Sequence, residues 1–373
     1  MYVFREHVID TSLPDGRYGQ TALADLDQDG TPEFVTGQQY GDIFCYKLNT
    51  PGDWTRFLLG EDSPSDVGAA VLDVDGDGWP DFVAGGAWYR NPRTPRTIFE
   101  RIVFDPDLRG VHDVVAADMD GDGRMDVLTM SDQNDLRWYR IPADPREPWS
   151  CTRIGDPVHS GAAVGDLTGN GAMDVVRTNV WFENVRGDGT EWVERPLPFP
   201  PQAQQRLTKQ WMVNATHAQV CDVDGDGSND IVMVENELPG GKLMWMQNVR
   251  GDGSEWVLHN IWLPEEEIRG AYHSLFVGDL DGDGDLDVLS CEMEAIPGDG
   301  PPRYFIWENL DGRGEAWAEH VVFDGNLGGH ATVVGDITGN GLPDIISKPW
   351  HPSASNALGG SQFVLFLENT GRA

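Results

Sequence analysis

Short apolar runs alternate with polar clusters along the chain, and residues 112–154 show one full unit of this pattern. Four runs rich in aliphatic and aromatic residues lie at 112–117, 126–130, 136–140 and 149–154, and clusters of Gly, Asp and Pro separate them. Such runs and breaks are signals of β-strands and turns. The unit therefore predicts four short strands joined by tight connections.

The unit recurs, and each copy is marked by a nine-residue Asp-rich loop between its first and second strands. The loops begin at Asp25, Asp73, Asp118, Asp166, Asp222, Asp279 and Asp336. These starts are 48, 45, 48, 56, 57 and 57 residues apart, a period typical of propellers and solenoids. Trp recurs in the third and fourth strands, and we interpret it as packing between neighbouring sheets.

Four strands in each of seven units predict an all-β fold, a seven-bladed β-propeller of four-stranded antiparallel blades. The seventh unit, 327–370, ends after its third strand, while Phe4–His7 resembles the fourth-strand segment Trp317–His320. We therefore expect the N-terminal strand 2–9 to complete the last blade, which removes two loose sheet edges. Residues 1–373 are predicted to form a single propeller domain.

Charge and cysteine content limit the classes of binding partner and the cell compartment that we expect. The formal net charge is −36, and without a basic stripe a nucleic-acid partner is not expected. No apolar run approaches the ~18 residues of a membrane span. Cys45, Cys151, Cys221 and Cys291 show no pairing pattern and are predicted to be free thiols. Without a signal peptide the expected location is cytoplasmic, or secreted if a leader was removed.

The Asp-rich loops offer carboxylates at alternating positions, which hard cations such as Ca²⁺ prefer. The predicted structural calcium ligands are Asp25, Asp27, Asp29 and Glu33; Asp73, Asp75, Asp77 and Asp81; Asp118, Asp120, Asp122 and Asp126; Asp222, Asp224, Asp226 and Asp230; and Asp279, Asp281, Asp283 and Asp287. The loops that begin at Asp166 and Asp336 carry Thr and Asn instead of two of these carboxylates. The alternative is that Asp and Asn only cap tight hairpins through Asx-turns.

Repeats of Asp-x-Asp-x-Asp-Gly-x-x-Asp between short strands resemble the FG-GAP/VCBS repeats, which also occur in integrin α-chain propellers. The resemblance extends over essentially the whole chain. It implies the propeller fold and leaves the activity open, because one fold hosts many functions.

Histidines precede the Asp loops at a nearly constant distance. His112, His273 and His330 lie six residues before their loops, His159 lies seven before and His217 five before. Because a six-residue strand spans roughly 20 Å, these side chains are expected at the opposite rim, near the propeller axis. Offsets of five and seven change the strand parity, so a bulge or a different orientation is expected there. His7, His259 and His320 fall on outer strands and are interpreted as structural.

The loops between second and third strands reach the same rim and add further candidate residues. They are Tyr40, Arg177, Glu235, Glu237, Glu292, Glu294, Lys348, Trp350 and His351. Imidazole with carboxylate suits Zn²⁺ or Mn²⁺ better than Ca²⁺. We therefore predict a divalent transition metal at the rim, held by His217, His273 and His330 with Glu235 or Glu292.

The predicted catalytic residues are the five rim histidines with Lys348, His351 and Tyr40, where a histidine or Lys348 could act as the base. Trp88, Trp350 and Tyr40 could stack on a sugar, and Arg177, Glu237 and Glu294 could bind its polar groups. No nucleophile elbow, Walker loop or dinucleotide fingerprint is present.

The rim histidine pattern resembles the propeller part of aldos-2-ulose dehydratase and the propeller-type polysaccharide lyases, which implies metal-assisted elimination from sugars. We predict a metal-dependent lyase or dehydratase that acts on a keto-sugar or uronide, free or in an oligosaccharide, by proton abstraction and β-elimination. The alternative is a calcium-dependent, lectin-like or adhesion propeller without catalysis. A homo-oligomer is compatible with both.

Overall fold

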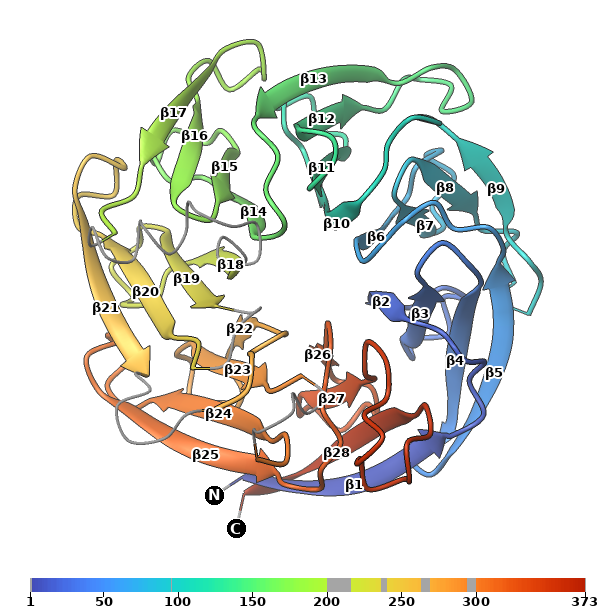
Figure 1. Ribbon diagram of the computed structural model, residues 1–373. Helices are drawn as coiled ribbons and strands as arrows, with labels where there is room; N and C mark the ends of the chain where they lie inside the picture. The colour runs from blue at the N-terminus through green and yellow to red at the C-terminus, as the bar shows by residue number, and fades with distance from the viewer. Residues whose placement is uncertain are drawn as a thin grey trace.

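In the computed structural model the chain forms a closed ring of seven four-stranded antiparallel sheets (Figure 1). The structure describes residues 2–94, 96–199, 216–235, 240–262, 269–293 and 300–372. These residues contain 28 β-strands and no α-helix. The predicted all-β, seven-bladed propeller is thereby confirmed.

Each blade runs from an innermost strand to an outer edge strand, and blades 1 to 7 follow chain order. The innermost strands are β2 (Tyr18–Ala24), β6 (Ala69–Leu72), β10 (Val111–Ala117), β14 (Ala162–Gly165), β18 (Thr216–Cys221), β22 (Phe276–Gly278) and β26 (Val333–Gly335). The second strands are β3 (Glu33–Gln38), β7 (Asp81–Ala84), β11 (Asp126–Ser131), β15 (Asp174–Arg177), β19 (Asp230–Glu235), β23 (Asp287–Cys291) and β27 (Asp344–Ser347).

The remaining two strands of each blade lie towards the outside of the ring (Figure 1). The third strands are β4 (Ile43–Thr50), β8 (Ala87–Arg90), β12 (Leu136–Arg140), β16 (Val180–Asn184), β20 (Leu243–Asn248), β24 (Tyr304–Asn309) and β28 (Val364–Arg372). The outer strands are β5 (Asp53–Gly60), β9 (Glu100–Val103), β13 (Ser150–Gly155), β17 (Trp192–Pro196), β21 (Trp256–Trp262), β25 (Trp317–Phe323) and β1 (Tyr2–Asp10).

The N-terminal strand closes the ring, as predicted. β1 is the outer strand of blade 7 and pairs antiparallel with β28, with Glu6 opposite Leu367 and Val8 opposite Leu365. The two chain ends therefore lie side by side (Figure 1). This pairing joins the first and last segments of the chain in one sheet.

Apolar side chains from adjacent blades form the core between the sheets. Trp88, Trp181 and Trp245 lie at equivalent places in the third strands, and Trp307 lies one residue further along its strand. All four are 0 to 2% exposed. Each large aromatic removes ~150–250 Å² from water, so these residues dominate the packing energy. The predicted packing role of the recurrent third-strand Trp is confirmed.

A carboxylate and, in five of the seven repeats, an asparagine fasten the Asp loop to its surroundings. In blade 2, Asp81 Oδ2 accepts a hydrogen bond from Val74 N at 3.0 Å, and Oδ1 accepts one from Asn91 N at 2.7 Å. Asn91 Nδ2 in turn donates to Leu26 O of blade 1 at 2.9 Å. The same amide bond to the preceding blade recurs from Asn184 to Met119 O, from Asn248 to Leu167 O and from Asn309 to Val223 O. The repeat therefore encodes contacts within a blade and between blades.

All four cysteines are free, as predicted. Burial raises the pKa of the Cys291 thiol to about 11 and that of Cys45 well above its usual value, which keeps both protonated at neutral pH. The described part of the chain contains no helix with the length and apolarity that a membrane crossing requires.

Candidate functional site

The structure gathers the five rim histidines into one group of neighbouring rings. The ring centroids of His159 and His112 are 4.2 Å apart, and those of His273 and His330 are 3.9 Å apart in a stacked arrangement. His112, His217 and His273 form a triangle with centroid separations of 6.4, 6.0 and 5.2 Å. Imidazoles from successive blades, which lie 47 to 58 residues apart in sequence, thus meet at the propeller mouth.

Local backbone features bring these rings together. The pairing of β10 with β11 shifts between Val111 and Asp113, so His112 is the extra residue of a β-bulge. The histidines of blades 6 and 7 lie just before their innermost strands, where Ala331 N donates to His273 O at 3.0 Å. The bulge or reorientation was expected at His159 and His217, but the bulge lies at His112, and His217 pairs in regular register with Val234.

The histidines line a cavity of about 210 Å³ at the mouth. Its lining residues are Gln39, Asp66, Val67, His112, His159, His273, Met293, His330 and Trp350. The Trp350 ring stacks on His330 with centroids 5.1 Å apart. A Cβ at Gly19 would lie 2.7 Å from the Trp350 ring and from Asp66 O, so only glycine allows this close packing.

Burial and neighbouring charges shift the pKa values of titratable side chains at the propeller mouth. Burial, followed by the nearby His273 and Lys348, holds the pKa of His330 well below its usual value, so this imidazole is neutral at pH 7. Burial raises the pKa of the Asp66 carboxyl, whose Oδ1 accepts a hydrogen bond from Gln39 Nε2 at 2.5 Å. Burial alone would raise the pKa of Asp113, but its interactions with His112 lower it overall. The neutral imidazole of His330 thus lies at the same mouth as carboxyls of different acidity.

The triangle of His112, His217 and His273 is suited to hold a metal ion. An ion bound tetrahedrally by three imidazoles at ~2.1 Å would hold the ring centroids about 5 Å apart, and the observed separations are 5.2 to 6.4 Å. His112 is 4% exposed, and its Nδ1 has no hydrogen-bond partner among the described residues. In the described parts, groups of three possible ligand atoms within 4.8 Å of one another occur only on Asp loops. The three rings would therefore have to reorient before they could share an ion.

The three histidines of the triangle differ from the predicted set of His217, His273 and His330. His330 stacks parallel to His273 at an interplanar angle of 18°, and its Nδ1 lies 3.4 Å from Lys348 Nζ, so it stands outside the triangle that His112 completes. Glu292 is buried, and its carboxylate accepts hydrogen bonds from Gly270 N at 2.8 Å and Arg303 N at 2.9 Å. Glu235 Oε2 accepts a bond from Lys242 N at 3.2 Å. Neither glutamate lines the cavity, because both brace their own loops.

Lys348 does not have the position of a catalytic base. Its side chain is fully buried, and Nζ donates to Tyr18 O and to His330 O at 2.8 Å. It does not line the cavity. The ammonium instead joins blade 7 to blade 1 beneath His330, and the predicted base role is corrected to a structural one.

Several predicted substrate contacts also lie away from the cavity. The expectation that Trp88 stacks on a sugar is wrong, because this side chain is 0% exposed in the core between blades 2 and 3. Arg177 is buried and donates to Asp156 O at 2.8 Å. Tyr40 lines a separate surface pocket with Arg101 and Arg109.

Three further predicted residues do not contribute to the described cavity. His351 is exposed and is absent from the cavity lining. Glu237 and Glu294 lie outside the described residues. Of the predicted substrate-binding residues, Trp350 is the one that lines the cavity.

Asp66 and Gln39 line the cavity although neither was predicted as a site residue. Asp66 lies seven residues before Asp73, the same distance that separates His159 from Asp166. It is therefore the member of the histidine position class in blade 2. A search for any polar residue at this distance from an Asp loop, rather than for histidines alone, would have found Asp66.

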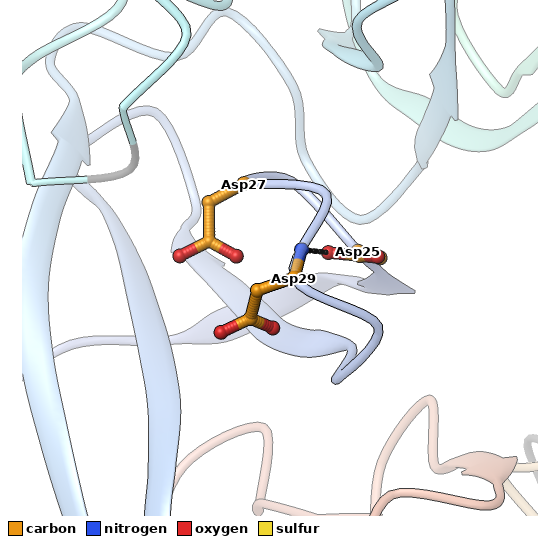
Figure 2. Close-up of side chains that lie close together, drawn as sticks. All are labelled: Asp25, Asp27 and Asp29. Carbon is orange, nitrogen blue, oxygen red and sulfur yellow. Dashed lines mark hydrogen bonds between the residues drawn. The ribbon is translucent and has the colours of Figure 1, made fainter.

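The Asp loops lie at the other end of the innermost strands, and Figure 2 shows Asp25, Asp27 and Asp29 of blade 1. Asp25 accepts hydrogen bonds from Asp29 N at 3.0 Å and Gly30 N at 2.8 Å. Asp29 Oδ1 accepts one from Thr31 N at 3.0 Å, two residues on, as in an Asx-turn. The groups whose carboxylate atoms lie within 4.8 Å of one another are Asp25, Asp27 and Asp29; Asp73, Asp75 and Asp81; Asp118, Asp120 and Asp122; Asp222, Asp224 and Asp230; and Asp279, Asp281 and Asp283. Turn formation and cation binding are thus both compatible with the loops.

The Asp loops also carry the likeness to known sequences. The FG-GAP-like repeat family matches residues 25–84, 118–176 and 222–290, which together are just over half of the chain. The chain belongs to the FG-GAP-like repeat family. Each match runs from an Asp loop to the second strand of the following blade. Of the four asparagines that contact the preceding blade, Asn248 is the one that lies within a matched range.

Solved structures support the fold assignment of this FG-GAP-like propeller. They include two crystal structures of BBS1N in complex with ARL6DN, one soaked with lead and the other with mercury. Each has a TM-score of 0.57 and 10% sequence identity, over 100% of this chain and 99% of the other. At this identity the likeness concerns the fold alone. No curated protein matches the chain significantly in sequence.

Proposed function

We propose that this propeller is a metal-dependent carbon–oxygen lyase that acts on a small keto-sugar or uronide at its mouth. The observation that carries the proposal is the triangle of His112, His217 and His273 beside the cavity. Imidazole nitrogens are ligands that suit Zn²⁺. When bound there, such an ion would polarise a carbonyl or carboxylate of the substrate.

The cavity size favours a small substrate. Its volume of about 210 Å³ is below the ~300–1,000 Å³ of pockets that hold drug-sized ligands. Trp350 supplies an aromatic wall on which the apolar face of a sugar ring could pack. We therefore favour a monosaccharide or the end of an oligosaccharide.

Asp66 is the side chain best placed to move a proton. It lines the cavity, and its raised pKa brings it closer to neutrality, where a general base is most effective. In the proposed step Asp66 takes a proton from the carbon next to the carbonyl. A carbon–carbon double bond forms as the C–O bond at the next carbon breaks. The leaving oxygen takes a proton from His159, whose imidazolium Asp132, 3.3 Å away, would stabilise.

The test combines metal analysis with an elimination assay. The purified protein is supplied with Zn²⁺ or Mn²⁺ and incubated with a panel of keto-sugars and uronides, and the ultraviolet absorbance of the enone product is followed. Asp66→Asn is expected to lower the rate by about 10²–10⁴-fold, and His112→Ala to weaken metal binding. His259→Gln, on outer strand β21, serves as the control. If no absorbance change appears with any metal or sugar, the lyase proposal fails.

A binding propeller without catalysis is the second candidate. It is supported by the complexes of BBS1N with ARL6DN, in which a propeller of similar fold has a protein partner. The net charge of −36 would then favour a basic partner. Transition metal that co-purifies with the protein and is lost in His112→Ala distinguishes the enzyme from this alternative.

Structural calcium in the Asp loops is a separate part of the proposal. It is supported by the triads of carboxylates in the loops of blades 5 and 6, which are Asp222, Asp224 and Asp230, and Asp279, Asp281 and Asp283. The ions would stabilise the ring rather than take part in catalysis, because the loops lie away from the cavity residues.

A further inference from the structure

In each blade, the second residue of the second strand pairs with one residue of the third strand. The next residue along the third strand is here called the loop-side position. In blades 1 to 7 the loop-side residues are Lys47, Arg90, Arg140, Glu183, Gln247, Glu308 and Glu368. The first three are basic, and no later blade has a basic residue there. The charge at this position therefore divides the ring into two parts.

In blade 1 the loop-side Lys47 enters the Asp loop. Its Nζ lies 2.5 Å from Asp27 Oδ2, 2.8 Å from Asp29 Oδ2 and 2.9 Å from Glu33 Oε1. Burial alone would lower the pKa of Lys47, but hydrogen bonds to the three carboxylates raise it well above its usual value. Lys47 is 13% exposed and Glu33 0%, so the charges meet largely out of water. The ammonium thus lies among the carboxylates that were predicted to bind calcium.

The loop-side arginines of blades 2 and 3 make the corresponding contacts. Arg90 Nε lies 2.5 Å from Asp75 Oδ2. Arg140 NH2 lies 2.7 Å from Asp120 Oδ2 and 2.9 Å from Asp122 Oδ2. In each blade a cation of the chain contacts the carboxylate at the third position of the loop.

The blades whose loops have lost carboxylates show the opposite arrangement. The loops of blades 4 and 7 carry Thr and Asn at their third and fifth positions, and the loop-side residues are Glu183 and Glu368. These glutamates pair with the outer strands instead, with Arg195 at 2.7 Å and His7 at 2.9 Å. In these two blades an acidic loop-side residue thus accompanies a loop of reduced acidity.

Blades 5 and 6 keep acidic loops without a basic loop-side residue. In blade 5, Gln247 donates to Asp224 at 2.7 Å, and this amide brings no charge. In blade 6, Arg372 from β28 lies 2.5 Å from Asp281 and 3.0 Å from Glu308. A loop-side cation is therefore a feature of blades 1 to 3.

We propose that Lys47, Arg90 and Arg140 are built-in counter-ions that neutralise the Asp loops of blades 1 to 3 in place of a bound divalent cation. The physical reason is that a covalently attached cation avoids both the dehydration of a free ion and its binding equilibrium. These three loops then keep their fold at any calcium concentration. The proposal does not depend on the enzymatic function proposed above.

The test measures calcium stoichiometry and thermal stability of the full chain. Lys47→Met is expected to bind one calcium equivalent more than the wild type, as measured by isothermal titration with CaCl₂. In excess chelator, the Tm of Lys47→Met is expected to lie several degrees below that of the wild type. Added calcium should raise the Tm of Lys47→Met by more than it raises the Tm of the wild type. Arg195→Met removes a similar ion pair from blade 4 and should leave the stoichiometry unchanged.

Two results would overturn the proposal. The first is an unchanged calcium stoichiometry in Lys47→Met, whatever happens to its Tm. The second is a wild type that loses a calcium equivalent when Asp27 and Asp29 are changed to Asn, because the ion would then already occupy the blade 1 loop. If Lys47→Met does not fold, Arg140→Met, which removes a half-exposed side chain, is judged by the same two measurements.

Discussion

Two lysines show how position within the fold decides what a single residue does. Lys47 lies among three carboxylates, and Lys348 lies among backbone carbonyls of blades 7 and 1. Both are largely removed from water, so each ammonium needs several acceptors to offset its desolvation. The same side chain therefore closes a loop in one place and joins two blades in the other.

Lys348→Met tests the structural role at the residue scale. Loss of the ammonium leaves Tyr18 O and His330 O without this donor, so the free energy of unfolding should fall by about 1–3 kcal/mol. Urea unfolding measures the change. Lys242→Met, at a partly exposed position, should stay within about 0.5 kcal/mol of the wild type. Unchanged stability would contradict the assigned role and return Lys348 to the list of candidate bases.

At the scale of elements, each blade depends on short strands and on the contacts of its loops with the preceding blade. The strands predicted at 112–117, 126–130, 136–140 and 149–154 agree with β10 to β13 to within one residue at each end. This agreement is physical, because alternating apolar residues and turn-forming Gly, Asp and Pro act locally. The amide contacts from one blade to the next, in contrast, join residues 65 to 86 positions apart.

Asn248→Ala tests such a contact. Asn248 Nδ2 donates to Leu167 O of blade 4 at 2.8 Å, and its Oδ1 accepts a bond from Gly253 N at 3.0 Å. Because these groups are buried, their loss should lower the free energy of unfolding by about 1–3 kcal/mol in a denaturant titration. Asn49→Ala, at an exposed third-strand position, should change it by less than about 0.5 kcal/mol. Equal effects of the two substitutions would refute the role of the buried amide.

At the scale of the whole molecule, closure of the ring depends on how the N-terminal strand is held between the last and the first blade. β1 pairs with β28 of blade 7, and its last residue, Asp10, contacts blade 1. Asp10 Oδ2 lies 2.7 Å from Tyr46 OH and 2.6 Å from Arg56 NH1. A carboxylate at the end of the chain's first strand thereby joins the two blades that meet at the closure.

The closure contact predicts a pH dependence. Burial alone would raise the pKa of Asp10, but hydrogen bonds from Ser12 and Tyr46, with Arg56, lower it overall. A depressed pKa contributes stability that is present above the unfolded value of about 3.9 and is lost as the pH falls through the folded value. Asp10→Asn should therefore be about 1–3 kcal/mol less stable than the wild type at pH 7. In urea titrations this difference should shrink below about pH 4, and a constant difference would contradict it.

The sequence alone determined the number of blades, the strand positions and the way the ring closes. These properties depend on local turn chemistry and on the repetition of one unit. Each copy of the unit therefore supports the strand assignment in the other copies. The same repetition placed the histidines on one rim, because their distance from the Asp loops is nearly constant.

Only the tertiary structure decided which rim residues share the cavity. Trp88, Glu292 and Lys348 lie within a few residues of the rim in sequence but are buried among their neighbours, whereas Asp66 faces the cavity. The direction of a side chain there depends on a bulge such as the one at His112 and on the blades packed beside it. These contacts join distant parts of the chain, and a local pattern cannot specify them.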